Sequence, residues 1–295
     1  MVVVQCVAGA SGTWRGKDRG HPGDNSEEHR ADRDSMDTSV TPSHKRLRQG
    51  GLSLVIWLVA GILVGAALRR ERPSSMAELI AGLSTGIAWN VVLGLAVLAC
   101  LTRFFRWTDL GFNRPDGRVA LRLMWFPILT LLPIFALACA IGLPPDRAIG
   151  YLAINTALVA LSEEWMFRGI VFRALSAHLR LWPAILLTAF LFGAVHVLNV
   201  FAMGDLGQAT GQAVAATMTG LLLGALLLRT GSLWPPIVFH MFWNFGLLLV
   251  TYEAAQQPLP EGPLPLEAYL VPLTIVMPNL FYALFLLRKV RNAPA

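Results

Sequence analysis

Residues 161–169 read Leu161-Ser-Glu-Glu-Trp-Met-Phe-Arg-Gly169 and set three charges inside a long apolar run. An ionised side chain near the middle of a membrane helix costs about 2.5–3.5 kcal/mol on insertion scales, so three together require pairing, a water-filled cavity or a function. Glu164 and Arg168 are one helical turn apart on nearly the same face, whereas Glu163 points about 100° away. The sequence therefore predicts that Glu164 pairs with Arg168 and that Glu163 is free for chemistry.

The composition is that of an integral membrane protein. Hydrophobic residues make up 55% of the 295-residue chain and charged residues 14%, against roughly 25% charged in soluble domains. The formal net charge of +6 fits basic membrane loops, and no basic stripe with interleaved aromatics is present, so we expect no nucleic-acid partner. The cysteines Cys6, Cys100 and Cys139 are scattered and predict neither a disulfide framework nor a metal cluster.

The chain divides into a polar tail and a membrane domain. Residues 1–50 are mixed in charge with little apolar content, which predicts a disordered tail, with Met1 and Met36 as alternative starts. Residues 51–295 are predicted to form an all-α polytopic membrane helix bundle with about eight transmembrane helices. Its apolar segments are residues 52–68, 79–101, 121–142, 149–172, 182–200, 209–228, 233–250 and 266–287.

The loop charges predict the orientation. If the N-terminus is cytoplasmic, Lys and Arg residues near the segment ends are far more frequent on the cytoplasmic side than outside, as membrane topology requires. Both termini are therefore predicted to be cytoplasmic. The first outer loop, with Arg69, Arg70 and Arg72, is the exception. The fourth segment spans only if its charges face the bundle interior.

Further polar residues lie in two other apolar segments at helical spacing. Phe192-Gly-Ala-Val-His196 is followed by Asn199, and His240-Met-Phe-Trp-Asn244 places His240 and Asn244 on one face. A lone intramembrane histidine is more often a core group bonded to a backbone carbonyl, but two with a Glu-Glu pair favour function. The chain has no His-Glu-x-x-His zinc helix, Gly-x-Ser-x-Gly elbow or phosphate-binding glycine loop. Water is therefore the expected nucleophile.

These residue types can activate water in two ways. Glu163 can act as a general base while His196 helps to hold the water, or Glu163, His196 and His240 can coordinate a divalent metal, with zinc the first candidate. We favour the metal-free alternative on two grounds. Asn244 beside His240 suggests a pair facing an oxyanion. Glu164 is assigned to Arg168, which leaves no intramembrane acid to orient the metal-binding imidazoles.

The three motifs together resemble a known family. Glu163-Glu164-x-x-x-Arg168-Gly169, Phe192-x-x-x-His196 and the segment from Thr230 through His240 to Asn244 are similar to the motifs of the CAAX protease and bacteriocin-processing (CPBP, or ABI) family of intramembrane endopeptidases. The resemblance covers residues 149–250 and implies an eight-helix intramembrane peptidase similar to the type II CAAX prenyl endopeptidases, which remove the last three residues of a prenylated substrate.

The resemblance implies a role for each matching residue. Glu163 takes the catalytic-base role, His196 helps to position the water, and His240 with Asn244 stabilises the oxyanion. Glu164 and Arg168 are structural support. The substrate would be a membrane-associated peptide, with or without a lipid, and the family is commonly named metalloprotease. The rival hypotheses are a catalytically silent immunity or binding protein on the same scaffold and an ion-coupled carrier, although the two halves of the chain show no internal repeat.

Overall fold

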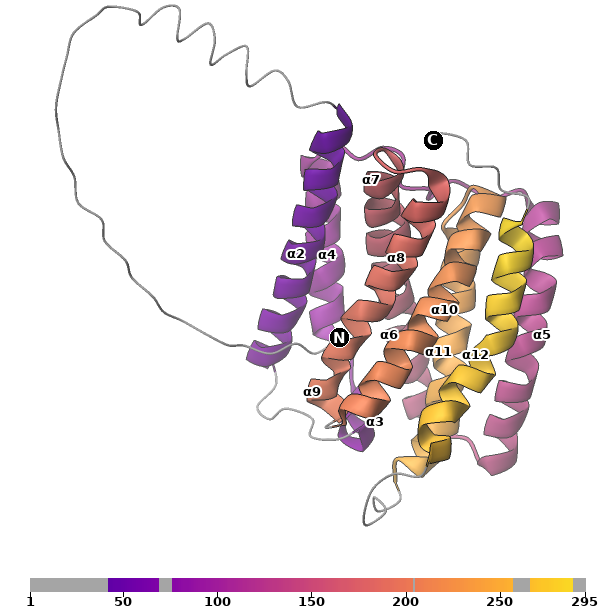
Figure 1. Cartoon of the computed structure of the whole chain (residues 1–295). Coiled ribbons are helices and arrows are strands. Elements are labelled where there is room, and N and C mark those ends of the chain that lie inside the picture. The colour runs from indigo at the N-terminus through magenta and orange to yellow at the C-terminus, as the bar shows by residue number, and fades with distance from the viewer. Residues whose placement is uncertain (1–41, 69–75, 204, 257–265, 289–295) are drawn as a thin grey trace, which may run out of the picture.

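The computed structural model describes residues 42–68, 76–203, 205–256 and 266–288, and all the regular structure in these residues is helical (Figure 1). The predicted all-α membrane bundle is confirmed. Its elements in chain order are α2 (Pro42–Leu68), α3 (Met76–Thr85), α4 (Trp89–Phe104), α5 (Gly117–Ile141), α6 (Asp146–Glu164), the π-helix η1 (Trp165–Val171), α7 (Phe172–Ser176), α8 (Leu181–His196), the 3₁₀-helix η2 (Val197–Asn199), α9 (Val200–Met203), α10 (Leu206–Thr230), α11 (Trp234–Ala254) and α12 (Leu266–Leu287).

The number of spans differs from the eight that the sequence predicted. By length and composition, six helices in the described part of the chain can cross a membrane, namely α2, α5, α8, α10, α11 and α12. The helices α3 and α4 form a seventh candidate span if they are counted together as one broken helix, and the chain bends by 73° between them. The helix α6 carries charged residues, including Glu163 and Glu164, and is therefore not apolar enough to count as a span by composition. Figure 1 shows the start of α2 and the end of α12 at the same end of the bundle.

The first helix begins earlier than predicted. α2 starts at Pro42, a residue favoured at the first helical position, so residues 42–50 are helical although the sequence placed them in the tail. Within this first part of α2, the Arg46 guanidinium forms an ion pair with Asp109 and lies 4.7 Å from the centre of the Trp107 ring. The rest of the predicted tail lies outside the described residues.

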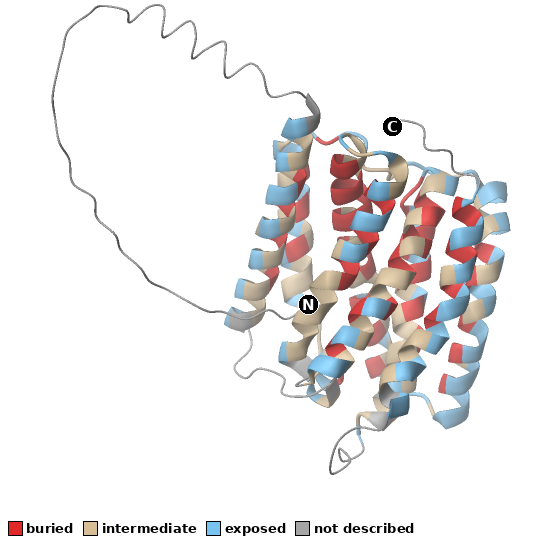
Figure 2. Cartoon of the chain, viewed as in Figure 1, coloured by how far each residue is buried: buried red, intermediate tan, exposed pale blue. Residues whose placement is uncertain are grey.

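The interior of the bundle is built around α6, η1 and α10. The helix α6 packs along α11, α3 and α4, and α10 packs between α8 and α12. Figure 2 shows buried residues on the inward faces of the helices and exposed residues on the outward faces. Many of the exposed residues are large and apolar, such as Trp125, Phe190 and Phe281. Such outward faces fit a hydrocarbon surrounding rather than water.

The break between α3 and α4 is held by one buried amide. The Asn155 side chain on α6 accepts a hydrogen bond from the Ala88 backbone N–H and donates to the carbonyls of Leu83 and Gly86, each at 2.8 Å. The backbone groups freed by the break therefore have partners, as a membrane interior requires.

A close approach between α8 and α10 fixes the position of His196 along α8. A Cβ atom built on Gly193 would lie 1.9 Å from Thr217 Oγ1 and 2.4 Å from the Ala213 carbonyl oxygen. Only glycine therefore fits at this crossing, which is three residues before His196 at the end of α8.

Candidate active site

Two of the three charges in the opening motif form a buried pair. Arg168 Nη1 donates to Glu164 Oε1 at 2.8 Å across the junction of α6 and η1, and the two side chains are 1% and 0% exposed. The spacing of four residues brings them together on one face. The structure therefore pairs the two residues that the sequence expected to pair.

The Arg168 guanidinium also joins two further helices. Nη2 donates to the Gly220 carbonyl on α10 at 3.1 Å, and the guanidinium lies 4.3 Å from the centre of the Phe192 ring on α8. A planar cation can make both contacts at once because its hydrogen bonds lie in its plane while the ring faces it. Arg168 thus contacts three helices, α6, α8 and α10.

Glu164 has a second partner that the sequence did not predict. His240 Nδ1 on α11 lies 2.8 Å from Glu164 Oε1, so a Nδ1 proton is donated to the carboxylate. The sequence predicts Arg168 as the single partner of Glu164. Because the carboxylate also holds an imidazole in place, one of the two arguments for metal-free catalysis is wrong: an acid that orients this histidine is present.

The other nitrogen of His240 faces Glu163. His240 Nε2 lies 3.7 Å from Glu163 Oε2, beyond direct hydrogen-bond distance. That oxygen is buried and has no hydrogen-bond partner among the described residues. A water molecule can bridge two polar atoms at this separation. His240 is therefore held by one glutamate and presented to the other.

Glu163 lies beside a small cavity between α2, α4 and α6. Its volume is about 30 Å³, room for about one water molecule, while 13% of the Glu163 side chain remains exposed. The cavity is lined by Trp57, Asn90, Val91, Gly94, Val159, Ser162 and Glu163. Trp57 Nε1 donates to Ser162 Oγ at 3.0 Å, which closes one wall.

The Phe192 ring contacts both His196 and His240. His196 Nδ1 lies 2.7 Å from the Phe192 carbonyl, and the imidazole packs edge-on to the Phe192 ring at 4.9 Å. The His240 ring packs on Phe192 as well, at 5.8 Å between centres. Both imidazoles therefore border one aromatic side chain, each with Nδ1 engaged and Nε2 available.

Two predicted amides form no hydrogen bond with this cluster. Asn244 is half-buried one turn after His240 on α11, and its side chain forms no hydrogen bond with the described residues. Asn199 Nδ2 donates to Gln212 Oε1 on α10 at 2.7 Å. Asn244 is thus free to meet a ligand, whereas Asn199 links η2 to α10.

The donors for a metal are present, but they do not assemble. One carboxylate and two imidazoles suit zinc chemically. In the described residues, however, no three His, Cys, Asp or Glu side chains are arranged so that they could hold a metal ion. We therefore derive no step through a metal, and the zinc alternative stays a prediction for Glu163, His196 and His240.

Comparison with protein families gives one match. Residues 145–246 match the family described as "Type II CAAX prenyl endopeptidase Rce1-like". This part of the chain is therefore similar to that family. The match confirms the family resemblance of the motifs over a range close to the predicted 149–250. Comparisons with curated proteins and with solved structures found no match.

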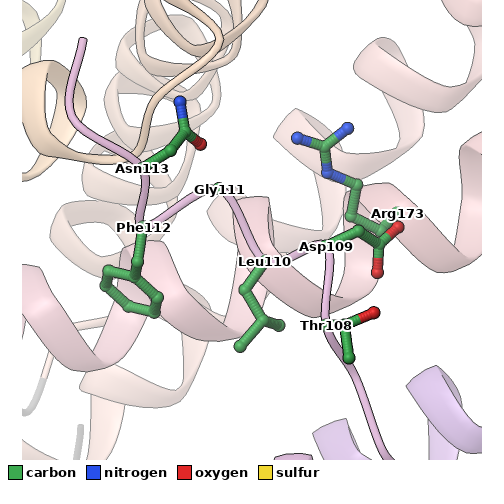
Figure 3. Close-up of a pocket in the computed structure, with 7 residues that line it drawn as sticks. All are labelled: Thr108, Asp109, Leu110, Gly111, Phe112, Asn113 and Arg173. Carbon is green, nitrogen blue, oxygen red and sulfur yellow. The ribbon is translucent and has the colours of Figure 1, made fainter.

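A second pocket contains none of these residues. A cavity of about 380 Å³ is formed by the loop between α4 and α5 together with Arg173 on α7 (Figure 3). Its lining contains one acid, Asp109, and one base, Arg173, and none of the predicted site residues. Asp109 is already paired with Arg46. The loop is anchored to the turn before α11, where Leu233 N–H donates to the Gly111 carbonyl at 2.7 Å.

Sequence reasoning missed two residues of the candidate site. Phe192 was quoted only as part of a motif, yet its ring contacts Arg168, His196 and His240. Asn155 was not singled out, although a lone amide in an apolar segment is a signal that should have drawn attention. The contacts of Phe192 have no comparable signal, because an aromatic residue in a membrane helix is ordinary.

Proposed function

We propose that this protein is an intramembrane endopeptidase that hydrolyses a peptide bond of a membrane-associated substrate, by CAAX-type C-terminal processing, with water activated by Glu163. The observation that carries the proposal is the Glu163 carboxylate. One of its oxygens is buried without a hydrogen-bond partner among the described residues, lies 3.7 Å from His240 Nε2 and belongs to a side chain that lines a cavity of about one-water size. Glu164 also has one buried oxygen without a partner, but its other oxygen bonds Arg168 and His240, whereas Glu163 forms no hydrogen bond with the described residues. An acid in an apolar bundle that neither packing nor pairing explains is a candidate for chemistry.

In the proposed first step, Glu163 accepts a proton from water as the water oxygen attacks the scissile carbonyl carbon. His196 Nε2 is free to help hold this water because its Nδ1 is engaged by the Phe192 carbonyl. The carbonyl π bond opens and its electrons move to the oxygen, which becomes an oxyanion. Glu163 then returns the proton to the leaving amine as the C–N bond breaks.

We assign stabilisation of the oxyanion to His240 and Asn244. His240 can donate from Nε2 while Nδ1–H is held by Glu164, an arrangement in which a carboxylate stabilises the imidazolium. Glu164 and Arg168 thus support His240 without touching the substrate.

The test uses the purified full chain in liposomes. Peptides ending in Cys-aliphatic-aliphatic-X, with and without a prenyl group on the cysteine, are incubated with wild type and with Glu163→Gln, and products are identified by mass spectrometry. We expect wild type alone to release the C-terminal tripeptide. Equal release by both proteins would remove Glu163 from the mechanism. Binding without cleavage by wild type would favour the silent binding protein on the same scaffold.

The cofactor question needs its own measurement. Elemental analysis of purified active protein is combined with cleavage assays before and after exhaustive chelation. The remaining argument for metal-free catalysis is Asn244 beside His240, and on that ground we propose that activity survives chelation. One zinc per active chain, with activity lost to the chelator and restored by zinc, would replace the glutamate-only mechanism and leave the peptidase proposal in place.

A further inference from the structure

The break between α3 and α4 lies directly before the cavity wall. The helix α3 ends at Thr85 and α4 begins at Trp89, and two residues of the first turn of α4, Asn90 and Val91, line the cavity beside Glu163. An uninterrupted helix would need no side chain to satisfy its backbone. The position of this wall therefore depends on what holds the break.

Asn155 holds it from both sides. It accepts from Ala88 N–H, just before α4, and donates to the carbonyls of Leu83 and Gly86, at the end of α3. The side chain is 1% exposed, so water does not compete for these bonds. Asn155 lies two helical turns before Glu163 on the same helix. One rigid element therefore carries both the base and the amide that fixes the opposite wall.

The polar lining and the size of the cavity specify its occupant. A volume of about 30 Å³ holds about one water molecule and is far too small for a peptide. The Asn90 amide, the Ser162 hydroxyl and the Glu163 carboxylate supply the two to four polar partners that a buried water needs. The Asn90 side chain forms no hydrogen bond with the other described residues, so both its donor and its acceptor groups are available.

We propose that Asn90 holds a water molecule next to Glu163, and that Asn155 is a positioning residue that sets Asn90 at this place by holding the α3–α4 break. The inference rests on the proposed peptidase function, for which this water would be the reserve from which the nucleophile is replaced. In this mechanism Asn90 acts on turnover and not on recognition of the peptide.

The kinetic test compares Asn90→Leu and Asn155→Leu with the matched control Thr156→Val. Thr156 is also buried on α6, but its hydroxyl bonds only to carbonyls of its own helix. We expect each Leu variant to lower kcat by about fivefold to tenfold, the size of one lost hydrogen bond, with KM unchanged. Thr156→Val should match wild type. A rise in KM with kcat unchanged for Asn90→Leu would overturn the water site and make Asn90 a peptide contact.

Two further variants separate positioning from folding. Asn155→Asp keeps the acceptor for Ala88 N–H, so its kcat should lie between those of wild type and Asn155→Leu. The double variant Asn90→Leu/Asn155→Leu should be no slower than the slower single variant, because both changes remove the same water. Multiplied losses in the double variant would show that Asn155 does not act through Asn90.

A readout that needs no cleavage distinguishes failure of this inference from failure of the peptidase proposal. In a background with Cys6, Cys100 and Cys139 changed to Ser, the thiol introduced by Asn90→Cys is labelled with a maleimide. We expect Asn155→Leu to change the labelling rate and Thr156→Val to leave it alone. Equal rates in all three backgrounds would overturn the positioning role, whether or not the protein cleaves peptides.

Discussion

Glu163 and Glu164 are neighbours in the chain, yet they lie in opposite surroundings. Glu164 is fully buried, and its Oε1 bonds both Arg168 and His240 at 2.8 Å. Glu163 is 13% exposed, has no hydrogen bond to the described residues and borders a cavity. The rotation of about 100° between successive helical residues produces the difference. Identical side chains are thus placed differently: Glu164 is bonded to Arg168 and His240, and Glu163 borders the cavity between α2, α4 and α6.

The contacts of Glu164 hold in place the helix that also carries Glu163. The Glu164 side holds its charges with an ion pair, an imidazole and an aromatic ring, and these contacts join α6, α8, α10 and α11. The helix that carries Glu163 is therefore fixed without any contact from Glu163 itself. Preorganisation of this kind is what general-base catalysis requires.

The largest expected effect separates the two acids directly. Glu163→Gln should lower kcat by about 10²–10⁴-fold, because the amide cannot accept a proton, while the melting temperature stays near that of wild type. Glu164→Gln should lower the melting temperature, because it weakens the contacts to Arg168 and His240. Cleavage kinetics and thermal unfolding in detergent measure both. Loss of stability in Glu163→Gln would erase the distinction.

Removal of the arginine tests the structural side alone. Arg168→Ala should reduce the free energy of unfolding by about 3–5 kcal/mol, because it leaves a buried carboxylate without its cation. Adding Glu164→Gln should restore part of this loss by removing the charge. Denaturant unfolding of the single and double variants in detergent gives the comparison. A double variant no more stable than Arg168→Ala would contradict the proposed pair.

Asn244 sharpens the comparison on the reactive side. Asn244→Ala should lower kcat by about 10²–10³-fold if the amide stabilises an oxyanion, without loss of stability, because the side chain forms no hydrogen bond with the described residues. Asn199→Ala is the matched control, since that amide bonds Gln212 instead. A drop in melting temperature with activity retained would assign Asn244 to packing.

The smallest effect concerns the wall of the cavity. Trp57→Phe removes the indole N–H that bonds Ser162 and should reduce the free energy of unfolding by about 0.5–1.5 kcal/mol. Activity should change little, because the aromatic volume is kept. Unfolding and cleavage are measured on the same preparation. A loss of activity as large as that of Glu163→Gln would mean that the Trp57 side of the cavity takes part in the reaction.

Much of the site could be predicted because charged residues in an apolar chain are conspicuous. The step of four residues from Glu164 to Arg168 gives their pairing from helix geometry alone. The contact between His240 and Glu164 joins residues 76 positions apart, and no spacing in the sequence encodes how α11 meets α6. For this reason the sequence predicts Arg168 as a partner of Glu164 but does not predict His240.

The fold shows the same division between local and distant causes. Apolar runs predicted the helices, but hydrophobicity does not distinguish a continuous helix from one broken near Gly86. The break becomes stable only because Asn155 on another helix satisfies it. Near the start of α2, Arg46 likewise pairs with the distant Asp109. Contacts of this kind, between residues far apart in the chain, are not encoded in local hydrophobicity.

The π-helix η1 changes the angular phase of everything that follows it. Phe172 N–H donates to the Phe167 carbonyl, five residues back, so one turn contains about one extra residue compared with an α-helix. Side chains after Val171 therefore stand about 100° around the axis from where an α-helical continuation would carry them. Deleting one residue here would rotate α7 and swing the buried Phe172 and Leu175 toward the outside. An alignment with a protein that has no such turn should accordingly place a one-residue gap within residues 165–171.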